Sequence, residues 1–422
     1  MKLMNRNFVL VVIGQIISLF GNSILRFALP LYLLDTTGSS AVFGAAMACS
    51  FIPMAVLSPV GGLLADRINK KNIMVVLDFA TALLAVAFLL GIGTYSPVVL
   101  VTAVMVILSG IQAVYQPSVQ ASMPLLQEKK NLMTANAIIN QVNALSGLLG
   151  PVAGGIVYGV WGLTPVVAAG CVCFFLSAVM EIFIRIPNVR QKEEQGVWAV
   201  VRQDMGSSLK YIRKEQPVIK KVVVIIALFN LFLTSLIIVG IPVIIKIYLG
   251  LSSQLYGYAQ GAGAAGGLIG GILTGILAGK LKIQKAWKLL LYTSFVLVPM
   301  GLVLAVPAPA AAAYIVMTLC YSIIMMIATM FSVQMLAYVQ EVTPVHLVGK
   351  VISMAMAVSM CAQPAGQAMY GILFDRFEQQ PYIVIGMTLA VTVAVVLMSR
   401  RIFAGIRQED NRPAPIAEAD LA

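Results

Sequence analysis

The sequence predicts an all-α integral membrane protein in which twelve transmembrane helices form two six-helix pseudo-repeats. Of its 422 residues, 60% are hydrophobic and only 10% are charged, and the mean hydropathy is +0.95. Apolar runs of about 20 residues, the length needed to cross a bilayer as a helix, recur along nearly the whole chain. Short charged turns separate these runs, because Asp, Lys and Arg are costly in hydrocarbon. A soluble globular domain is therefore excluded.

Hydropathy and helix-breaking residues place the elements in order. The first six spans are predicted at roughly 7–34, 40–65, 73–93, 97–121, 131–160 and 163–186, which form domain 1–186. A polar cytoplasmic linker follows at 187–217. The next six spans are predicted at roughly 218–249, 254–280, 286–306, 309–338, 348–375 and 380–403, which form domain 218–403. The polar tail, 404–422, is predicted to be disordered in the cytoplasm.

The two halves repeat each other. The spacing from Pro30 to Pro242 also separates Gly38 from Gly250, Tyr158 from Tyr370 and Gly159 from Gly371. A shared spacing for a Pro and a Tyr-Gly pair indicates parallel repeats, a design that places a substrate site near the midplane between the halves.

The positive charge is placed asymmetrically. The net charge is +12, and the 28 Lys and Arg residues fall on one predicted face except Arg26, Lys246 and Arg376. The positive-inside rule makes that face, with both termini, cytoplasmic. The charge therefore indicates membrane topology and no nucleic-acid partner. The five cysteines lie in apolar spans, so no disulfide framework is expected, and no cluster suggests a metal or a cofactor.

The charged turn after the second span carries the most specific motif. Five residues, Gly62, Asp66, Arg67, Lys70 and Lys71, match the Gly-x-x-x-Asp-Arg-x-Gly-Arg-Arg/Lys signature between helices 2 and 3 of the major facilitator superfamily, which the turn resembles. We expect Gly61 and Gly62 to permit close helix packing and Asn69 to adopt a left-handed turn conformation. The resemblance implies that Asp66 and Arg67 latch the cytoplasmic side, with Asp78 completing the charge cluster.

Two further motifs refine the resemblance. Ser146-x-x-x-Gly150-Pro151-x-x-Gly154-Gly155 resembles the signature of exporters in this superfamily, although the pattern also suits ordinary small-residue packing. Leu29-Pro30-Leu31-Tyr32, followed by Thr37-Gly38-Ser39-Ser40, resembles the macrolide-efflux branch. That branch often carries Asp where this chain has Asn22, which cannot titrate. Asp35 is the remaining candidate for proton coupling.

Polar residues recur at helical spacing in several spans and predict a water-filled cavity, or else hydrogen bonds that only join helices. The predicted cavity residues are Gln15, Asn22, Arg26, Gln112, Gln116, Asn136, Asn140, Asn143, Asn230, Met326, Met360 and Gln363. Arg26 is the most informative, since it could bind an anionic substrate, pair with Asp35, Asp375 or Glu378, or extend to the outer surface. Glu181 and Arg185 are spaced to pair with each other.

These observations predict a secondary transporter that exports lipophilic or amphipathic small molecules by alternating access. The alternatives are a carrier of one anionic metabolite, siderophore or lysolipid, and a non-transporting membrane sensor or enzyme. No catalytic cluster supports an enzyme. The expected partners are a small-molecule substrate, membrane lipid and protons, and the expected state is a monomer in a bacterial cytoplasmic membrane.

Overall fold

The structure is a computed structural model that describes residues 5–186, 217–344 and 347–409. The first half contains α1 (Arg6–Thr37), α2 (Ser40–Arg67), α3 (Lys70–Gly91), α4 (Pro97–Leu126), α5 (Lys129–Trp161) and α6 (Leu163–Ile182). The second half begins with one rod made of α8 (Pro217–Phe229), η2 (Asn230–Thr234), α9 (Ser235–Val243) and η3 (Ile244–Tyr248). It continues with α10 (Ser253–Leu277), η4 (Ile283–Lys285), α11 (Trp287–Ala305), α12 (Ala310–Val342), α13 (Val348–Arg376) and α14 (Pro381–Glu409).

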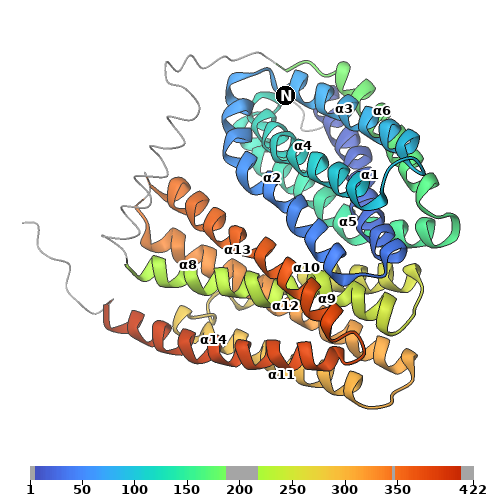
Figure 1. Cartoon of the computed structure of the whole chain (residues 1–422). Helices are drawn as coiled ribbons and strands as arrows, with labels where there is room; N and C mark the ends of the chain where they lie inside the picture. Colours follow the sequence, from blue (N-terminus) through green and yellow to red (C-terminus); the bar gives the residue numbers. More distant parts are fainter. Residues whose placement is uncertain (1–4, 187–216, 345–346, 410–422) are drawn as a thin grey trace, which may run out of the picture.

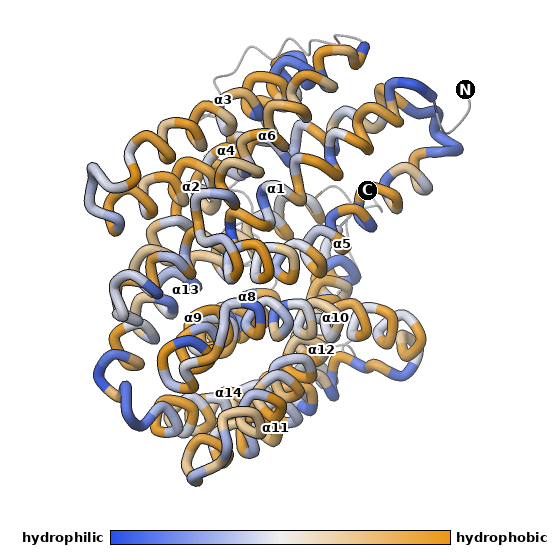
Figure 2. Tube along the Cα trace, turned by 90° about the vertical axis from the view of Figure 1, so that its right-hand side faces the viewer, coloured by the Kyte–Doolittle hydropathy of each residue, from blue (hydrophilic) through white to orange (hydrophobic). Residues whose placement is uncertain are grey.

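The described segments confirm the predicted all-α fold class, since every regular element in them is a helix and none is a strand. Eleven of these helical segments are long and apolar enough to cross a membrane. The twelfth predicted span, α13, falls outside that set because polar residues such as Ser359, Gln363 and Gln367 interrupt it. In Figure 2, hydrophobic residues cover most of the helices and hydrophilic residues gather at helix ends and turns.

Two predicted boundaries fall at the edges of the described residues. Helix α14 continues to Glu409, beyond the predicted boundary at residue 403, and 410–422 lie outside the described residues. The predicted linker also lies outside them, except for Pro217, which begins α8.

The helices form two bundles, α1–α6 and α8–α14 (Figure 1). We call the face where α1 begins and α14 ends the terminal face, and the face where α1 ends and α2 begins the opposite face. The repeat is visible at the opposite face, where Gly38 (φ 64°) and Gly250 (φ 62°) adopt the same left-handed conformation at corresponding turns.

The bundles meet along two helix pairs, α2 with α13 and α5 with α10. In Figure 1 they converge toward the opposite face and diverge toward the terminal face. Glycines permit the convergence: a Cβ on Gly44 would lie 2.9 Å from Cα of Gly371, and one on Gly155 would lie 3.0 Å from Cα of Gly257. Because backbone meets backbone at both crossings, these contacts leave no room for side chains.

Candidate functional site

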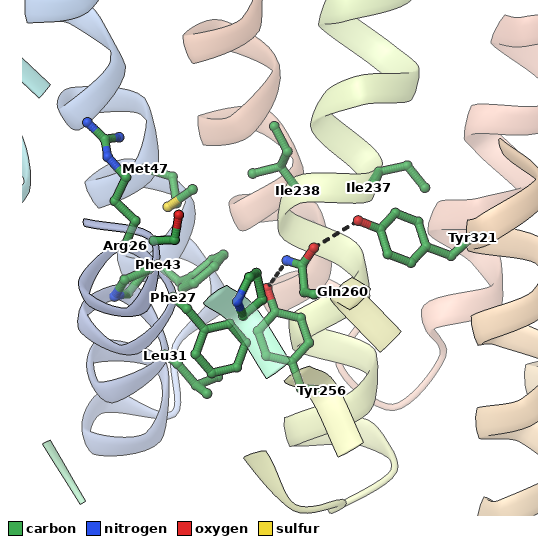
Figure 3. Close-up of a pocket in the computed structure, with 13 residues that line it drawn as sticks. Arg26, Phe27, Leu31, Phe43, Met47, Ile237, Ile238, Tyr256, Gln260 and Tyr321 are labelled. Carbon is green, nitrogen blue, oxygen red and sulfur yellow. Dashed lines mark hydrogen bonds between the residues drawn. The ribbon is translucent and has the colours of Figure 1, made fainter. Parts of the chain in front are cut away.

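A cavity of about 290 Å³ lies between the two bundles (Figure 3). Helices α1, α2 and α5 supply one wall, and α9, α10 and α12 supply the other. The lining residues are Ser23, Arg26, Phe27, Pro30, Leu31, Phe43, Met47, Pro151, Ile237, Ile238, Tyr256, Gln260 and Tyr321. An apolar and aromatic wall with a few polar groups is typical of sites for small organic ligands.

Arg26 is the cationic group of this cavity. Its side chain is exposed, and it also borders a smaller adjoining cavity of about 90 Å³ with Ser109. Its Nε donates to Asn22 Oδ1 (3.2 Å) and its NH2 nitrogen donates to Ser109 Oγ (3.3 Å). Arg26 thus pairs with none of the three carboxylates proposed for it, and its charge is held by neutral partners. Such a guanidinium keeps donors for an anionic or polar ligand group.

The second half contributes a hydrogen-bonded polar group of its own. Gln260 donates from Nε2 to the Tyr256 hydroxyl (2.6 Å), and Tyr321 donates to Gln260 Oε1 (2.8 Å). Figure 3 shows these three side chains opposite Arg26 and Phe27. Tyr256 also stacks on Phe27 across the two bundles, with ring centroids 5.0 Å apart. This aromatic pair joins the two walls.

An ion pair joins the bundles beyond this aromatic pair. Asp35, near the end of α1, accepts from Tyr158 of α5 (2.9 Å) and lies 3.2 Å from Lys246 Nζ of η3. Lys246 also donates to Ser253 of α10 (3.0 Å). The predicted coupling residue is therefore part of a contact between the halves at the opposite face.

A second contact caps one helix with a residue from the other half. Asp375 of α13 accepts from Ser39 Oγ (2.8 Å) and from the backbone N–H of Ser40 (2.6 Å), at the start of α2. A carboxylate is favoured at a helix N-terminus, where backbone N–H groups lack partners within the helix. Both contacts hold the opposite face closed.

The structure distributes the other predicted cavity residues differently. Gln15 is fully buried inside the first bundle and donates to Tyr115 (2.8 Å), so it does not line the cavity. Asn22 accepts from Arg26 but does not itself border the cavity. None of the remaining predicted residues borders the two cavities around Arg26: Gln112, Gln116, Asn136, Asn140, Asn143, Asn230, Met326, Met360 and Gln363. Of these, Asn136 and Asn140 are exposed, and Asn143 donates to the carbonyl of Ile139.

The charged turn between α2 and α3 differs from the prediction at Gly62 and Asn69. Gly61 makes the close approach, against the backbone of Ala113 in α4, whereas a Cβ on Gly62 would meet nothing within 4 Å. Asn69 caps α3 with φ −61°, accepting from Lys71 N–H, instead of adopting a left-handed conformation.

Asp78 is buried and accepts from Ser18 of α1 (3.0 Å), whereas its second oxygen has no partner, so it does not join Arg67. Lys70 is buried, whereas Arg67 and Lys71 are half-buried. The side chain of Asp66 lies outside the described part, and its role as a latch stays a prediction.

The motif in α5 packs on both neighbours at once. Gly150 and Gly154 face α1, where added Cβ atoms would meet Ser23 and Phe27, and Gly155 faces α10. Pro151 lines the cavity between them. The motif therefore lets α1 and α10 approach α5 on two sides of one helix.

A sequence profile described as Major Facilitator Superfamily matches residues 11–363. The chain belongs to the major facilitator superfamily. It is 25% identical over 390 residues to macrolide efflux protein A of Streptococcus pyogenes, covering 91% of this chain and 93% of that protein. A shorter match, 26% over 164 residues, covers 38% of this chain and 41% of the staphyloferrin A transporter of Staphylococcus aureus (strain NCTC 8325 / PS 47).

Solved structures support the same fold. A bacterial homologue of the iron transporter ferroportin in its inward-facing state aligns with a TM-score of 0.73 and 16% identity, over 94% of this chain and 99% of that one. Its outward-facing state aligns with a TM-score of 0.60 and 18% identity, over 96% and 100%. As a member of the major facilitator superfamily, the chain is a multi-pass membrane transporter, not an enzyme.

Proposed function

We propose that this transporter exports lipophilic or amphipathic small molecules across a bacterial cytoplasmic membrane by alternating access, in exchange for protons. The observation that carries the proposal is the cavity between the bundles, whose wall is apolar and aromatic apart from Ser23, Arg26 and the hydrogen-bonded polar groups of Tyr256, Gln260 and Tyr321. The similarity to macrolide efflux protein A over nearly the full length of both chains supports export and the substrate class.

The proposed orientation places the terminal face in the cytoplasm, where the positive-inside rule puts the basic residues. The opposite face is then external and closed in this conformation. The higher TM-score to the inward-facing state of the ferroportin homologue supports this assignment. Substrate enters from the cytoplasm or the inner leaflet, and release requires the Asp35–Lys246 and Asp375–α2 contacts to break. In this proposal, protonation of Asp35 from outside frees Lys246 and favours opening.

The test is an efflux assay in a bacterium depleted of its own exporters. Cells that express the chain should accumulate less of a macrolide antibiotic and of lipophilic dyes than cells with empty vector, and a protonophore should abolish the difference. Unchanged accumulation across the panel would refute export of this class. Efflux that survives the protonophore would refute proton exchange.

A second candidate, a carrier of an anionic metabolite or siderophore, is favoured by Arg26 and by the partial match to the staphyloferrin A transporter. The variant Arg26→Gln separates the two candidates. An anion carrier should lose its anionic substrate with this change, whereas a lipophile exporter should keep most of its efflux of uncharged and cationic compounds. The matched control is Arg376→Gln, because Arg376 is exposed at the opposite face, away from the cavity.

A further inference from the structure

Two carboxylates are buried together inside the first bundle, away from the cavity. Asp78 of α3 is 2% exposed and Glu181 of α6 is fully buried. The spacing of Glu181 and Arg185 predicted an ion pair, but Glu181 instead accepts a hydrogen bond from the Tyr115 hydroxyl of α4 (2.7 Å). Tyr115 in turn accepts from Gln15 of α1 (2.8 Å), and Asp78 accepts from Ser18 (3.0 Å). Four helices thus meet at this cluster.

The cluster has more acceptors than donors. One oxygen of each of three buried side chains has no hydrogen-bond partner: Gln15 Oε1, Asp78 Oδ2 and Glu181 Oε2. The Gln15 side chain points into the cluster, because its other terminal atom donates to Tyr115. The Tyr115 hydroxyl has already given its single proton to Glu181, and Ser177 has given its own to the carbonyl of Gly14. Buried acceptors without donors are costly, and each group of this kind requires an explanation.

In the part of the chain that the structure describes, no basic group pairs with either carboxylate. Within the described residues, no Lys, Arg or His nitrogen lies within 4 Å of either carboxylate. The neighbouring groups from α1 and α4 are neutral amide and hydroxyl groups. The nearest basic residues along α3, Lys70 and Lys71, lie about 10–12 Å away along the helix axis, from a rise of 1.5 Å per residue. Two carboxylates that are buried in one cluster without a basic partner cannot both hold a negative charge cheaply.

We propose that Asp78 and Glu181 form a proton-binding site, in which one proton binds to the unpartnered oxygen of one of the two carboxylates. The proton comes from water and returns to it, so one O–H bond forms and later breaks on a carboxylate oxygen. Protonation removes one negative charge and supplies the donor that the cluster lacks. The proposal deepens the proton exchange of the proposed function and rests on it for the role in transport, whereas proton binding itself needs no substrate.

The experiment measures the proton directly. The purified full chain in lipid nanodiscs is titrated from acidic to alkaline buffer while infrared difference spectra record carboxylic-acid C=O bands. The wild type should lose a band characteristic of a water-excluded carboxylic acid as pH rises. This band should be absent from Asp78→Asn/Glu181→Gln and retained in the control Glu378→Gln, since Glu378 is exposed.

Thermal unfolding of the same samples shows whether the variants are correctly folded. The amide variants add N–H donors where acceptors lack partners, so their melting temperature at alkaline pH should equal or exceed that of the wild type. The wild type should gain stability as pH falls, and the double variant should lose that dependence.

A band that persists in the double variant, or the absence of any such band from the wild type, would overturn the proposal. A midpoint that follows sodium concentration at constant ionic strength would instead indicate a metal-cation site. Failure of efflux in cells, with the band intact, would refute the proposed function alone.

Discussion

The crossing of α2 and α13 is the most direct test of how the opposite face closes. Gly44 packs against the backbone of Gln367 and Gly371, with Gln367 O only 2.5 Å from the position of an added Cβ. Gly44→Ala therefore places a methyl group against a carbonyl and a Cα, neither of which can rotate away. The only relief is separation of α2 from α13, which opens the opposite face.

The cost of such overpacking is typically about 1–3 kcal/mol. Because about 1.4 kcal/mol changes an equilibrium tenfold, the conformation described here should lose population by roughly 5- to 150-fold relative to one open at the opposite face. Gly147→Ala is the matched control, since a Cβ there meets nothing within 4 Å.

Double electron–electron resonance measures this shift. Spin labels on Glu128→Cys and Glu341→Cys, in a background without native cysteines, report the separation of the bundles at the terminal face, where both residues are exposed. Gly44→Ala should enrich short distances, because the terminal face closes as the opposite face opens. An unchanged distribution, or the same shift from Gly147→Ala, would refute steric closure at this crossing.

Three further outcomes follow from the contacts. Lys246→Met should change the population ratio of the two conformations less than tenfold in the same measurement. The reason is that a partly exposed ion pair with Asp35 contributes about 0.2–1 kcal/mol. Asp375→Ala should shift this population ratio in the same direction by about 1 kcal/mol, which is the usual contribution of a helix cap. An unchanged ratio in the same labelled background would exclude capping of α2 by the other half. Asp66→Ala should abolish efflux in the cell assay while surface labelling shows normal insertion, and wild-type efflux would exclude the predicted latch.

The sequence was sufficient for the fold because apolar length and charged turns determine which segments cross a membrane. The helix boundaries agree with the predicted spans to within a few residues at most ends, and the predicted pseudo-repeats reappear in the paired turns at Gly38 and Gly250. The close packing of the α5 motif could also be predicted, since small residues at a fixed spacing let neighbouring helices approach.

The cavity was harder to predict because helical periodicity shows that a polar face is turned inward, but not what it meets there. Gln15 and Arg26 belong to the same helix, yet one lies inside a bundle and the other between bundles. Tyr256 and Gln260 were not among the predicted cavity residues, although they lie on α10 in a glycine-rich stretch of the sequence. Their bulk and one-turn spacing among glycines was the available signal.

Helix α1 connects the proposed proton site to the cavity. Ser18, Asn22 and Arg26 follow one another at intervals of one turn, and the ends of this series touch Asp78 and the cavity. Eight residues correspond to about 12 Å along the axis. At an effective dielectric constant of about 20, unit charges at that distance interact by about 1.4 kcal/mol.

A cationic ligand near Arg26 would therefore lower proton affinity at the carboxylates by up to about tenfold. A proton bound there would weaken ligand binding by the same factor, as linkage requires. Mutual exclusion of this kind favours exchange of proton for cation, whereas an anion that neutralises Arg26 would favour joint binding.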